Sequence, residues 1–511
     1  MGRLKPTLIL GGPGCGKTTA LLNIVEQAFS RGVKPDRIAY VAFTRKAAQE
    51  AKERMVEKFG VEQDSIPYFR TLHSFAFRFI DAEPSQILTD RKLREYAQAE
   101  GLNLSKTFID EFGQAVPQPS TTDERALTAD SLMRLTGRHI DDVSLDMGVP
   151  TDYVRRVVDD YNEFKEDAIL YDFTDMLSRF VNEATLPEFD LLIVDEAQDL
   201  SALQWRMVEK LVDHSKDVYY AGDDDQAIYA WAGADIEHFL HLDADREVLP
   251  TSYRLKSGVF DACQKVIRFC DDRYPKDWQP HAQGGVVEHT NELDKLADDM
   301  REGSWFLLAR TNSLVRSMTK FARDRGFAYY SPTKDGMQSS VAVDPVQAVL
   351  IYENLRQGKR FEGDKMRLCW AHIAPKLRPE SAPVFDPTHD YGIDDLCATG
   401  FKADASWLET LVMPRPLQSY IRTLRAEKES LVKPPRITIS TIHGVKGGEA
   451  DNVVVWQKLT SLTHKTWIGP VGTQYDQEVR ALFTAMSRAR ERLIFLDATT
   501  AKQYHVERML R

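Results

Sequence analysis

The chain has 511 residues, of which 43% are hydrophobic and 28% charged, as expected for an ordinary globular protein of several domains. No apolar run is long enough for a transmembrane helix or a signal peptide, so we expect a cytoplasmic protein without membrane contact. The net charge of −11 disfavours a protein that coats nucleic acid by electrostatic attraction alone. Residues 81–170 hold nineteen Asp/Glu and ten Lys/Arg, so the remainder of the chain is close to neutral.

The five cysteines stand far apart and form neither a CxxC pair nor a cluster with histidine. This spacing argues against a disulfide framework, a structural zinc and an iron–sulfur cluster, and it favours a reducing compartment.

Short apolar segments that alternate with helical stretches predict a parallel α/β fold. Residues 7–10 form an expected strand that leads through a glycine-rich loop into a helix from about Thr18, and an expected strand at 38–43 precedes a helix over 45–59. Continuous apolar strands are typical of a sheet that helices cover on both faces. Further strands are expected at 191–194, 218–221, 437–440, 453–456 and 493–496.

Two helix-rich stretches interrupt this pattern. The first, residues 81–170, is acidic and contains a loop around residues 117–120, and the second covers about 346–430 and ends in proline-bearing segments. Because apolar strands occur near both ends of the chain, the sequence predicts two α/β domains, each with an insertion.

The glycine-rich loop matches the pattern GxxxxGK[ST] between a strand and a helix, which is the context that a phosphate-binding loop requires. Its backbone N–H groups and the helix N-terminus attract phosphate oxygens. We expect Lys17 to contact the β- and γ-phosphates and the Thr18 hydroxyl to ligate Mg²⁺. A chance glycine-rich turn is the alternative, which the flanking elements disfavour. The expected ATP-binding residues here are Gly11, Gly12, Pro13, Gly14, Cys15, Gly16, Lys17, Thr18 and Thr19.

The apolar segment 191–194 ends in two carboxylates, Asp195 and Glu196. At the carboxyl edge of a parallel sheet they would face the phosphate loop. We expect Asp195 to hold Mg²⁺, directly or through water, and Glu196 to polarise the attacking water. Solvated strand ends often carry acidic residues, so this pair alone would be weak evidence for a catalytic site. Together with the phosphate loop, the pair predicts nucleotide hydrolysis.

Residues 221–234, AGDDDQAIYAWAGA, resemble helicase motif III of the UvrD/Rep/PcrA group of superfamily 1 nearly letter for letter. The resemblance extends over most of the chain, and the motifs follow one another in the family order. It implies two RecA-like P-loop NTPase domains, with parallel sheets flanked by helices, and two mainly helical insertions. The other matching segments are 40–48 (motif Ia), 71–74 (Ib), 195–199 (II), 252–254 (IV), 440–449 (V) and 477–489 (VI).

The insertions fall where this family places domains 1B and 2B. The resemblance therefore implies motor domain 1A at 1–80 and 171–262, and insertion 1B at 81–170. It implies motor domain 2A at 263–345 and 431–511, with a short insertion 2B at 346–430.

The resemblance also implies roles at the nucleotide. Gln226 would sense the γ-phosphate, and Arg254 and Arg488 would act as arginine fingers from, or near, the second motor domain. Tyr253 would stack on adenine and Glu449 would accept a hydrogen bond from the ribose. A surface ion pair for Arg254 and a solvated basic helix face for Arg488 are the alternatives.

On the nucleic-acid side, the resemblance implies that aromatic rings stack on the bases of a single strand. Stacking tolerates any base, so a near-neutral chain can use it. Outside such a motif each ring would more often belong to the core. The expected contacts are Phe43, Tyr229 and Trp231 to bases, His73 and His443 to the backbone, and Thr44, Arg45 and Thr441 to phosphates.

Together these features imply an ATP-dependent helicase or translocase that moves 3′→5′ on single-stranded DNA and separates strands at single-strand/duplex junctions. It would need Mg²⁺ and act as a monomer, and RNA remains open as a substrate. The alternatives are a translocase that strips bound proteins with little unwinding, and a regulator that ATP only switches. The family's glutamine motif has no place in the ten residues before Gly11, so we expect weak discrimination between bases.

Overall fold

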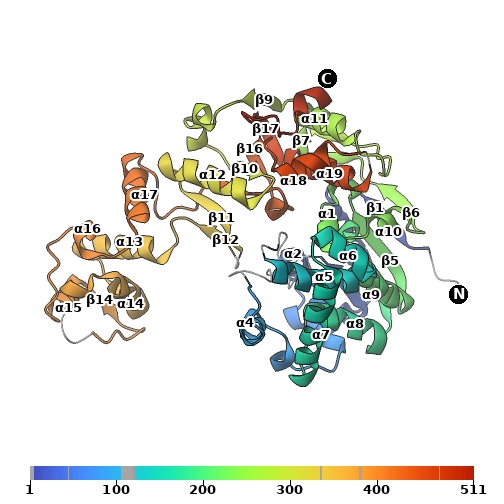
Figure 1. Cartoon of the computed structure of the whole chain (residues 1–511), viewed down its shortest axis with the longest axis horizontal. Coiled ribbons are helices and arrows are strands. Elements are labelled where there is room, and N and C mark those ends of the chain that lie inside the picture. Colours follow the sequence, from blue (N-terminus) through green and yellow to red (C-terminus); the bar gives the residue numbers. More distant parts are fainter. Residues whose placement is uncertain are drawn as a thin grey trace. The chain divides into compact units, whose positions relative to one another are not determined.

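The computed structural model describes residues 5–43, 45–104, 119, 121–333, 336–378, 383–470 and 472–511. Of the loop predicted at 117–120, Pro119 alone is among these residues. The chain divides into two compact units (Figure 1). Unit 1 comprises Met1–Val286, Lys465–Glu491 and Val506–Arg511, and unit 2 comprises Val287–His464 and Arg492–His505. No helix in the described ranges has the length and apolar character needed to cross a membrane.

Unit 1 is built on a six-stranded sheet in the order β3-β2-β4-β5-β1-β6, and the neighbouring strands run parallel. The strands predicted at 7–10, 38–43, 191–194 and 218–221 are confirmed. The strand bounds are β1 Thr7–Leu10, β2 Ile38–Ala42, β3 Phe69–Thr71, β4 Phe189–Val194, β5 Ser215–Gly222 and β6 Asp245–Val248.

Helices cover both faces of this sheet, which explains why its central strands are apolar throughout. Ile38 and Tyr40 point to the face covered by α1 (Lys17–Ser30) and α2 (Arg45–Phe59). Ala39, with other alternate strand residues, points to the face covered by α3, α8 and α9. The bounds of these three helices are Leu72–Phe79, Phe173–Glu183 and Ala202–Asp213.

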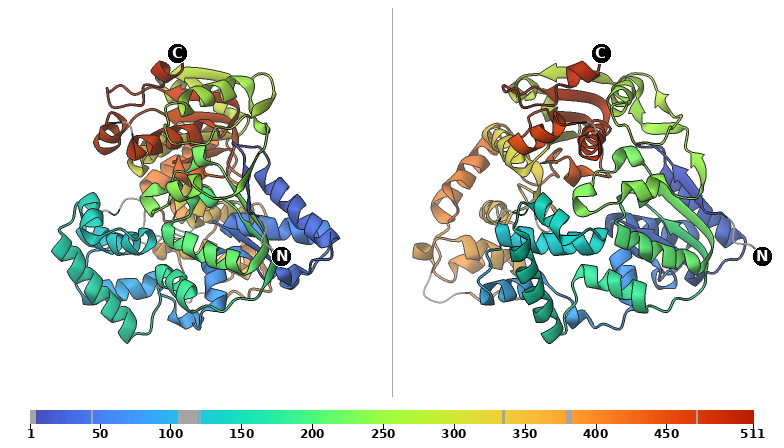
Figure 2. Two further views of the ribbon diagram at one scale, coloured as in Figure 1. Left: turned by 90° about the vertical axis from the view of Figure 1, so that its right-hand side faces the viewer. Right: turned by 45° about the vertical axis from the view of Figure 1, so that its right-hand side comes forward.

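The described residues of the acidic stretch 81–170 form a helical cluster with its own apolar core beside the sheet (Figure 1, Figure 2). Its helices are α4 Asp90–Ala99, α5 Thr122–Thr136, α6 Ile140–Met147 and α7 Thr151–Asp167. Unit 1 also contains α10 Ile236–Leu240, the strand pair β7 Thr251–Lys256 and β8 Gln279–Ala282, and the helices α11 Ser257–Ile267, α19 Thr473–Met486 and α20 Val506–Met509. Residues 465–491, which the expected boundaries assign to the second motor domain, cluster with unit 1, where α19 packs on α11.

Unit 2 contains most of a seven-stranded sheet in the order β12-β11-β15-β10-β16-β17-β9. The strands predicted at 437–440, 453–456 and 493–496 are confirmed within it. The bounds are β9 Val286–Thr290, β10 Trp305–Ala309, β11 Tyr329–Thr333, β12 Gly336–Ser339, β15 Ile437–Thr441, β16 Ala450–Trp456 and β17 Ala489–Leu496.

The remaining helices pack against this sheet or form a helix-rich part between β12 and β15. They are α12 Asn312–Asp324, α13 Asp344–Arg356, α14 Gly363–His372, α15 Ile393–Cys397, α16 Trp407–Thr410, α17 Arg415–Ala426 and α18 Ser461–Trp467, with a short strand pair of β13 Phe361–Glu362 and β14 Asp390–Tyr391.

Candidate nucleotide and nucleic-acid site

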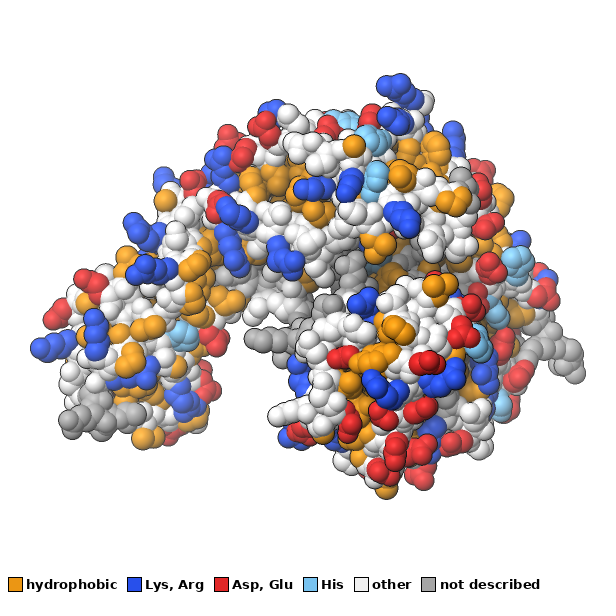
Figure 3. Space-filling view, viewed as in Figure 1, with side chains coloured by type: hydrophobic (Ala, Val, Ile, Leu, Met, Phe, Trp, Pro, Cys, Tyr) orange, Lys and Arg blue, Asp and Glu red, His pale blue; other side chains and the backbone are white. Residues whose placement is uncertain are grey.

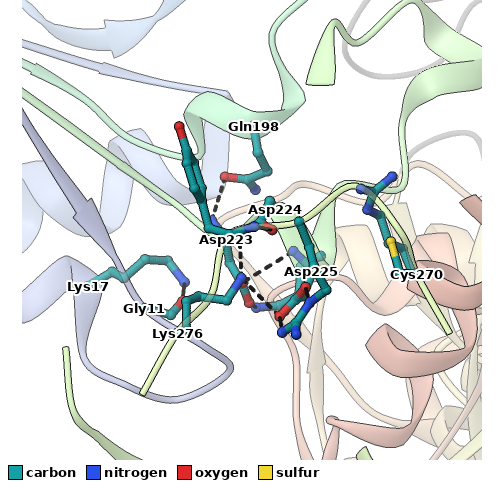
Figure 4. Close-up of polar contacts among 12 residues, drawn as sticks. Gly11, Lys17, Gln198, Asp223, Asp224, Asp225, Cys270 and Lys276 are labelled. Carbon is teal, nitrogen blue, oxygen red and sulfur yellow. Dashed lines mark hydrogen bonds and ion pairs between the residues drawn. The ribbon is translucent and has the colours of Figure 1, made fainter. Parts of the chain in front are cut away.

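The loop between β1 and α1 has the form that the sequence predicts for a phosphate-binding loop. Gly14 and Gly16 have φ of 74° and 79°, a left-handed conformation that glycine adopts without strain. Lys17 is the first residue of α1, and its Nζ donates a hydrogen bond of 2.7 Å to the carbonyl oxygen of Gly11 (Figure 4). The lysine therefore lies over its own loop, where phosphate oxygens would replace the carbonyl as its partner.

The segment Ser252–Arg254 lies directly against this loop, although about 240 residues separate the two in the sequence. The Ser252 hydroxyl donates to the carbonyl oxygen of Pro13 at 2.6 Å, and the Tyr253 N–H donates to that of Gly14 at 2.9 Å. A Cβ atom on Gly14 would lie 2.4 Å from the Cβ of Arg254, so this approach requires glycine. The Tyr253 ring is 68% exposed beside the loop, as a stacking platform for a base requires.

A second contact to the loop was not predicted from the sequence. The Trp278 ring packs on Gly12, where an added Cβ atom would lie 2.7 Å from the ring. Trp278 is buried and belongs to no motif that the sequence analysis identified. Its spacing from Gly12 in the sequence gives no signal, because the contact depends on how β8 lies in the folded unit.

The two carboxylates after β4 lie in different environments. Asp195 is buried and accepts hydrogen bonds from the Tyr40 hydroxyl and from the Glu196 N–H, both at 2.9 Å. Burial, followed by repulsion from Glu196, raises the pKa of Asp195 to about 6. A buried carboxylate that a neighbouring carboxylate repels gains stability from a divalent cation, so the donor set of Asp195 and the half-buried Thr18 suits Mg²⁺.

Glu196 has a left-handed backbone with φ of 54°, which is uncommon for a residue other than glycine and recurs at functional sites. The Gln198 side-chain amide donates to the Glu196 carboxylate at 2.6 Å, and its oxygen accepts from the Asp223 N–H at 3.0 Å. Gln198 thus joins the end of β4 to the end of β5 (Figure 4). The sequence placed Gln198 in motif II but assigned it no role.

The loop after β5 is held by a buried ionic cluster that the sequence analysis missed. Asp223, Asp224 and Asp225 surround the ammonium group of Lys276, and all four side chains are 0% exposed (Figure 4). The Lys276 Nζ lies 3.0 Å from Asp223 and 2.9 Å from Asp225, and Arg273 pairs with Asp225 at 2.7 Å.

Three carboxylates therefore share two cations. Burial raises the pKa of Asp224 to about 6 against the opposing charge of Lys276. Burial acts in the same sense on Asp225, but the charge of Lys276 and the hydrogen bonds from Arg273 outweigh it and lower the pKa of Asp225.

Two residues predicted from separate motifs meet at Gln226. Its side-chain amide donates to Asp223 at 2.6 Å, and its side-chain oxygen accepts a hydrogen bond from the guanidinium group of Arg488. Arg488 is 1% exposed, and its Nε also donates to the carbonyl oxygen of Thr484 at 3.0 Å. The buried position excludes the alternative of a solvated basic helix face for Arg488.

Downstream of Gln226 the same loop carries aromatic rings. The Tyr229 ring centroid lies 5.4 Å from that of Phe43 and 6.0 Å from that of Trp231. Phe43 also lines a cavity of about 250 Å³ together with His73 and Phe173. Phe43, His73, Tyr229 and Trp231 are all partly exposed, so they are accessible to a ligand.

The other predicted contacts lie elsewhere or are not described. Thr44 lies outside the described residues, and Arg45 opens α2 without a described side chain. Thr441 ends β15, His443 opens a short 3₁₀ turn, and the exposed Glu449 precedes β16, all within unit 2.

A phosphate loop after the first strand, an acidic end on a neighbouring parallel strand, and a sheet covered on both faces define a RecA-like P-loop nucleotide-binding protein. Residues 3–247 match the model of the UvrD/REP helicase N-terminal domain. The chain is therefore similar to the UvrD/Rep/PcrA group of superfamily 1A helicases.

The chain is similar to several curated proteins with the name ATP-dependent DNA helicase PcrA. It is 27% identical to that of Bacillus subtilis (strain 168) over 308 residues, which cover 56% of this chain and 40% of the relative. It is 26% identical to that of Leuconostoc citreum over 409 residues, which cover 75% of this chain and 52% of the relative. The matches thus span about half or less of the length of these relatives.

Proposed function

We propose that this protein hydrolyses ATP to move along single-stranded DNA, and that it separates the strands of a duplex ahead of it. By family resemblance the movement would be 3′→5′. The DNA-helicase names of the similar proteins support DNA as the polymer. The proposed partners are single-stranded DNA and single-strand/duplex junctions, with the protein acting as a monomer.

One observation carries the proposal: a single loop connects the phosphate site with the aromatic cluster. At its start, Asp223 is bonded to Gln198, which is bonded to Glu196. Gln226 follows three residues later, and Tyr229 lies against Phe43 at the cavity. A change in the contacts of Gln226 can therefore reach the rings within a few residues, which is what coupling of hydrolysis to movement requires.

The residues of the site have complementary proposed roles in hydrolysis. Lys17 neutralises phosphate charge, and Glu196 takes the proton of the attacking water. Arg488 and Arg254 stabilise the charge that develops on the transferred phosphoryl group, and Gln226 responds to its departure. Asp195 and Thr18 would hold Mg²⁺, which when bound neutralises charge on the phosphates.

The proposed domain organisation follows the family: 1A at 1–80 and 171–262, 1B at 81–170, 2A at 263–345 and 431–511, and 2B at 346–430. In this arrangement Thr441, His443 and Glu449 contribute from 2A to the strand and to the nucleotide. Tyr253 and Glu449 would hold adenine and ribose.

The test is the rate of ATP hydrolysis without polymer, with single-stranded DNA and with single-stranded RNA. We expect DNA to stimulate hydrolysis at least about tenfold. Equal rates in all three conditions would contradict a DNA motor and favour a regulator that ATP only switches. Strand displacement measured beside streptavidin displacement from a biotinylated end then separates unwinding from protein removal, since a translocase that strips proteins gives only the second signal.

A further inference from the structure

A groove of about 1070 Å³ lies between α4 and α7 in the acidic insertion, away from the site described above. Five exposed carboxylates line it: Glu95, Glu100, Asp160, Glu163 and Asp167. Acidic side chains gather over the lower part of this insertion in Figure 3. One lysine, Lys92, also lines the groove, and its ammonium group is bonded to the carbonyl oxygen of Ser85.

The carboxylates are poorly neutralised by the protein itself. Glu95 lies 3.8 Å from the exposed Arg91, a long and solvated contact. Glu100, Asp160, Glu163 and Asp167 form no ion pair with any other residue in the described part of the chain. The nearby Lys165 points elsewhere, because its ammonium group is bonded to Asp172 and Asp175.

The backbone adds to this negative potential. Helix α4 ends at Ala99 and α7 ends at Asp167, and both of these residues line the groove. The C-terminus of a helix favours cations, yet Glu100 and Asp167 stand there. Such a local conflict is expected where an external ligand supplies the missing charge.

The floor of the groove holds a polar group without a partner. Tyr96 is 4% exposed, and its hydroxyl has no hydrogen-bond partner among the described residues. Burial raises the pKa of Tyr96, and the charges of Asp160 and Glu100, which line the groove with it, raise it further. The Tyr96 ring stacks on Phe164, with 4.6 Å between the ring centroids.

One end of the groove is strained. Ile169 follows α7 with φ of 51° and is 59% exposed. A β-branched side chain is unfavourable in this left-handed conformation, and such strain is retained mainly at functional sites. The strain holds an apolar side chain at the rim of an acidic groove.

We propose that this groove binds an arginine-bearing segment of a partner protein. A guanidinium group pairs with carboxylates through a planar fork, stacks on aromatic rings and donates to a hydroxyl such as that of Tyr96. The volume of about 1070 Å³ has room for several residues of a peptide, whose apolar side chains would contact Ile169.

The other charged ligands fit less well. The phosphates of nucleic acid would be repelled by five carboxylates. Among the described residues, no group of three or more His, Cys, Asp or Glu side chains is close enough to hold a metal ion, which disfavours a divalent cation. The proposal does not depend on ATP hydrolysis, because none of the groove residues belongs to the nucleotide site.

The test uses the full chain and a fluorescein-labelled peptide, Gly-Arg-Gly-Arg-Gly-Arg-Gly, followed by fluorescence anisotropy. The same peptide with citrulline in place of arginine keeps the shape and removes the charge. The groove variant is Glu163→Gln/Asp167→Asn. A matched control, Asp141→Asn/Asp142→Asn, removes the same charge from exposed positions of α6 in the same insertion. Melting temperatures of all proteins report whether they are folded.

We expect the parent to bind the citrulline peptide at least about tenfold more weakly than the arginine peptide. The groove variant should weaken arginine-peptide binding at least about tenfold, the control less than about twofold, and Tyr96→Phe about threefold to tenfold. Equal losses in the groove variant and the control would overturn the proposal in favour of general charge attraction. Absence of binding by the parent, or competitive displacement of the peptide by oligo(dT), would also overturn it.

Discussion

The guanidinium group of Arg488 donates a hydrogen bond to the side-chain oxygen of Gln226, although 262 positions separate the two residues in the sequence. Gln226 in turn donates to Asp223 at the end of β5. The predicted arginine finger and the predicted sensor of the γ-phosphate are thus hydrogen-bonded to each other. The Gln226 oxygen would compete with the phosphate oxygens of a nucleotide for the guanidinium donors of Arg488. Phosphate oxygens would take Arg488 from Gln226, and this exchange provides a simple mechanism for sensing.

We predict that Arg488→Ala lowers the DNA-stimulated rate of ATP hydrolysis about 10³- to 10⁵-fold, because the charge on the transferred phosphoryl loses its cation. The measurement is kcat at saturating ATP and DNA. Arg508→Ala, at an exposed position of α20, is the control and should leave kcat unchanged. Since Arg488 is buried, Arg488→Lys with a melting temperature separates loss of chemistry from loss of fold. A kcat within tenfold of the parent for a folded Arg488→Ala protein would contradict the role.

Lys17→Ala and Glu196→Gln should both abolish turnover, by different routes. Loss of Lys17 removes the cation at the phosphates and should weaken nucleotide binding. Loss of the Glu196 carboxylate removes the base but keeps the size of the side chain and its contact to Gln198, so nucleotide binding should be largely retained. Binding of a fluorescent ATP analogue beside steady-state hydrolysis distinguishes the two. Hydrolysis by Glu196→Gln at the parent rate would show that another group is the base.

Nucleotide choice should be broad. The exposed Tyr253 ring offers a stacking surface, and stacking discriminates poorly between bases. We expect kcat/KM for GTP within about tenfold of that for ATP, a difference below about 1.4 kcal/mol. A hundredfold preference for ATP would mean that a polar group reads the edge of the adenine.

Trp231 should be a base platform and not a core residue. Trp231→Ala should weaken single-strand binding roughly 5- to 150-fold, which corresponds to about 1–3 kcal/mol of stacking, with little change in hydrolysis without DNA. The core residue Trp205, a buried residue of α9, supplies the contrast. Its replacement by alanine should cost about 3–5 kcal/mol of stability and lower every activity together. If Trp231→Ala lowers the melting temperature but leaves the single-strand affinity per folded molecule unchanged, Trp231 is not a base platform.

The buried ionic cluster makes a prediction about pH. The pKa of Asp224 is about 6 in the folded protein, above its usual value of about 3.9, so its contribution to stability is complete below pH 3.9 and is lost as the pH rises through 6. The melting temperature of Asp224→Asn should therefore rise relative to the parent between pH 4.5 and 7. Over each pH unit in that interval, the difference in the free energy of unfolding between Asp224→Asn and the parent changes by up to about 1.4 kcal/mol.

Asp190→Asn, on β4 and outside the ionic cluster, is the control for this experiment. Hydrogen bonds from Arg37 and Lys216 lower the pKa of Asp190, so its contribution to stability is fully present above about pH 3.9 and lost only at lower pH. The destabilisation of Asp190→Asn should therefore be constant from pH 4.5 to 7. If the stability of Asp224→Asn relative to the parent is also constant between pH 4.5 and 7, Asp224 stays ionised in the folded protein.

Those features that depend on neighbours in the sequence were accessible before the structure. The apolar strands, the glycine loop and the loop from Asp223 to Trp231 were all predictable, because local periodicity and motif spacing encode them. The family resemblance placed both Gln226 and Arg488 at the γ-phosphate, but it did not predict the hydrogen bond between them.

The sequence did not predict the contacts of three residues, Arg273, Lys276 and Trp278. They act on residues about 50 or more positions away, and their sequence context is an unremarkable polar segment with no spacing rule. Lys276 reads as a solvated lysine in the sequence, and only the fold surrounds it with three carboxylates. The same holds for Tyr96, whose hydroxyl could not be identified as unpartnered from sequence periodicity.

The packing of the Trp278 indole on Gly12 gives the protein an intrinsic spectroscopic reporter. Indole emission responds to nearby charge and to small changes in packing, and this ring touches the backbone that would close around phosphates. Occupation of the loop should therefore alter the tryptophan fluorescence of the unlabelled protein. The fluorescence change that is present in the parent and lost in Trp278→Phe reports on the loop itself. Followed in a stopped-flow instrument, it would give the rates of nucleotide binding and release without a dye or a modified nucleotide.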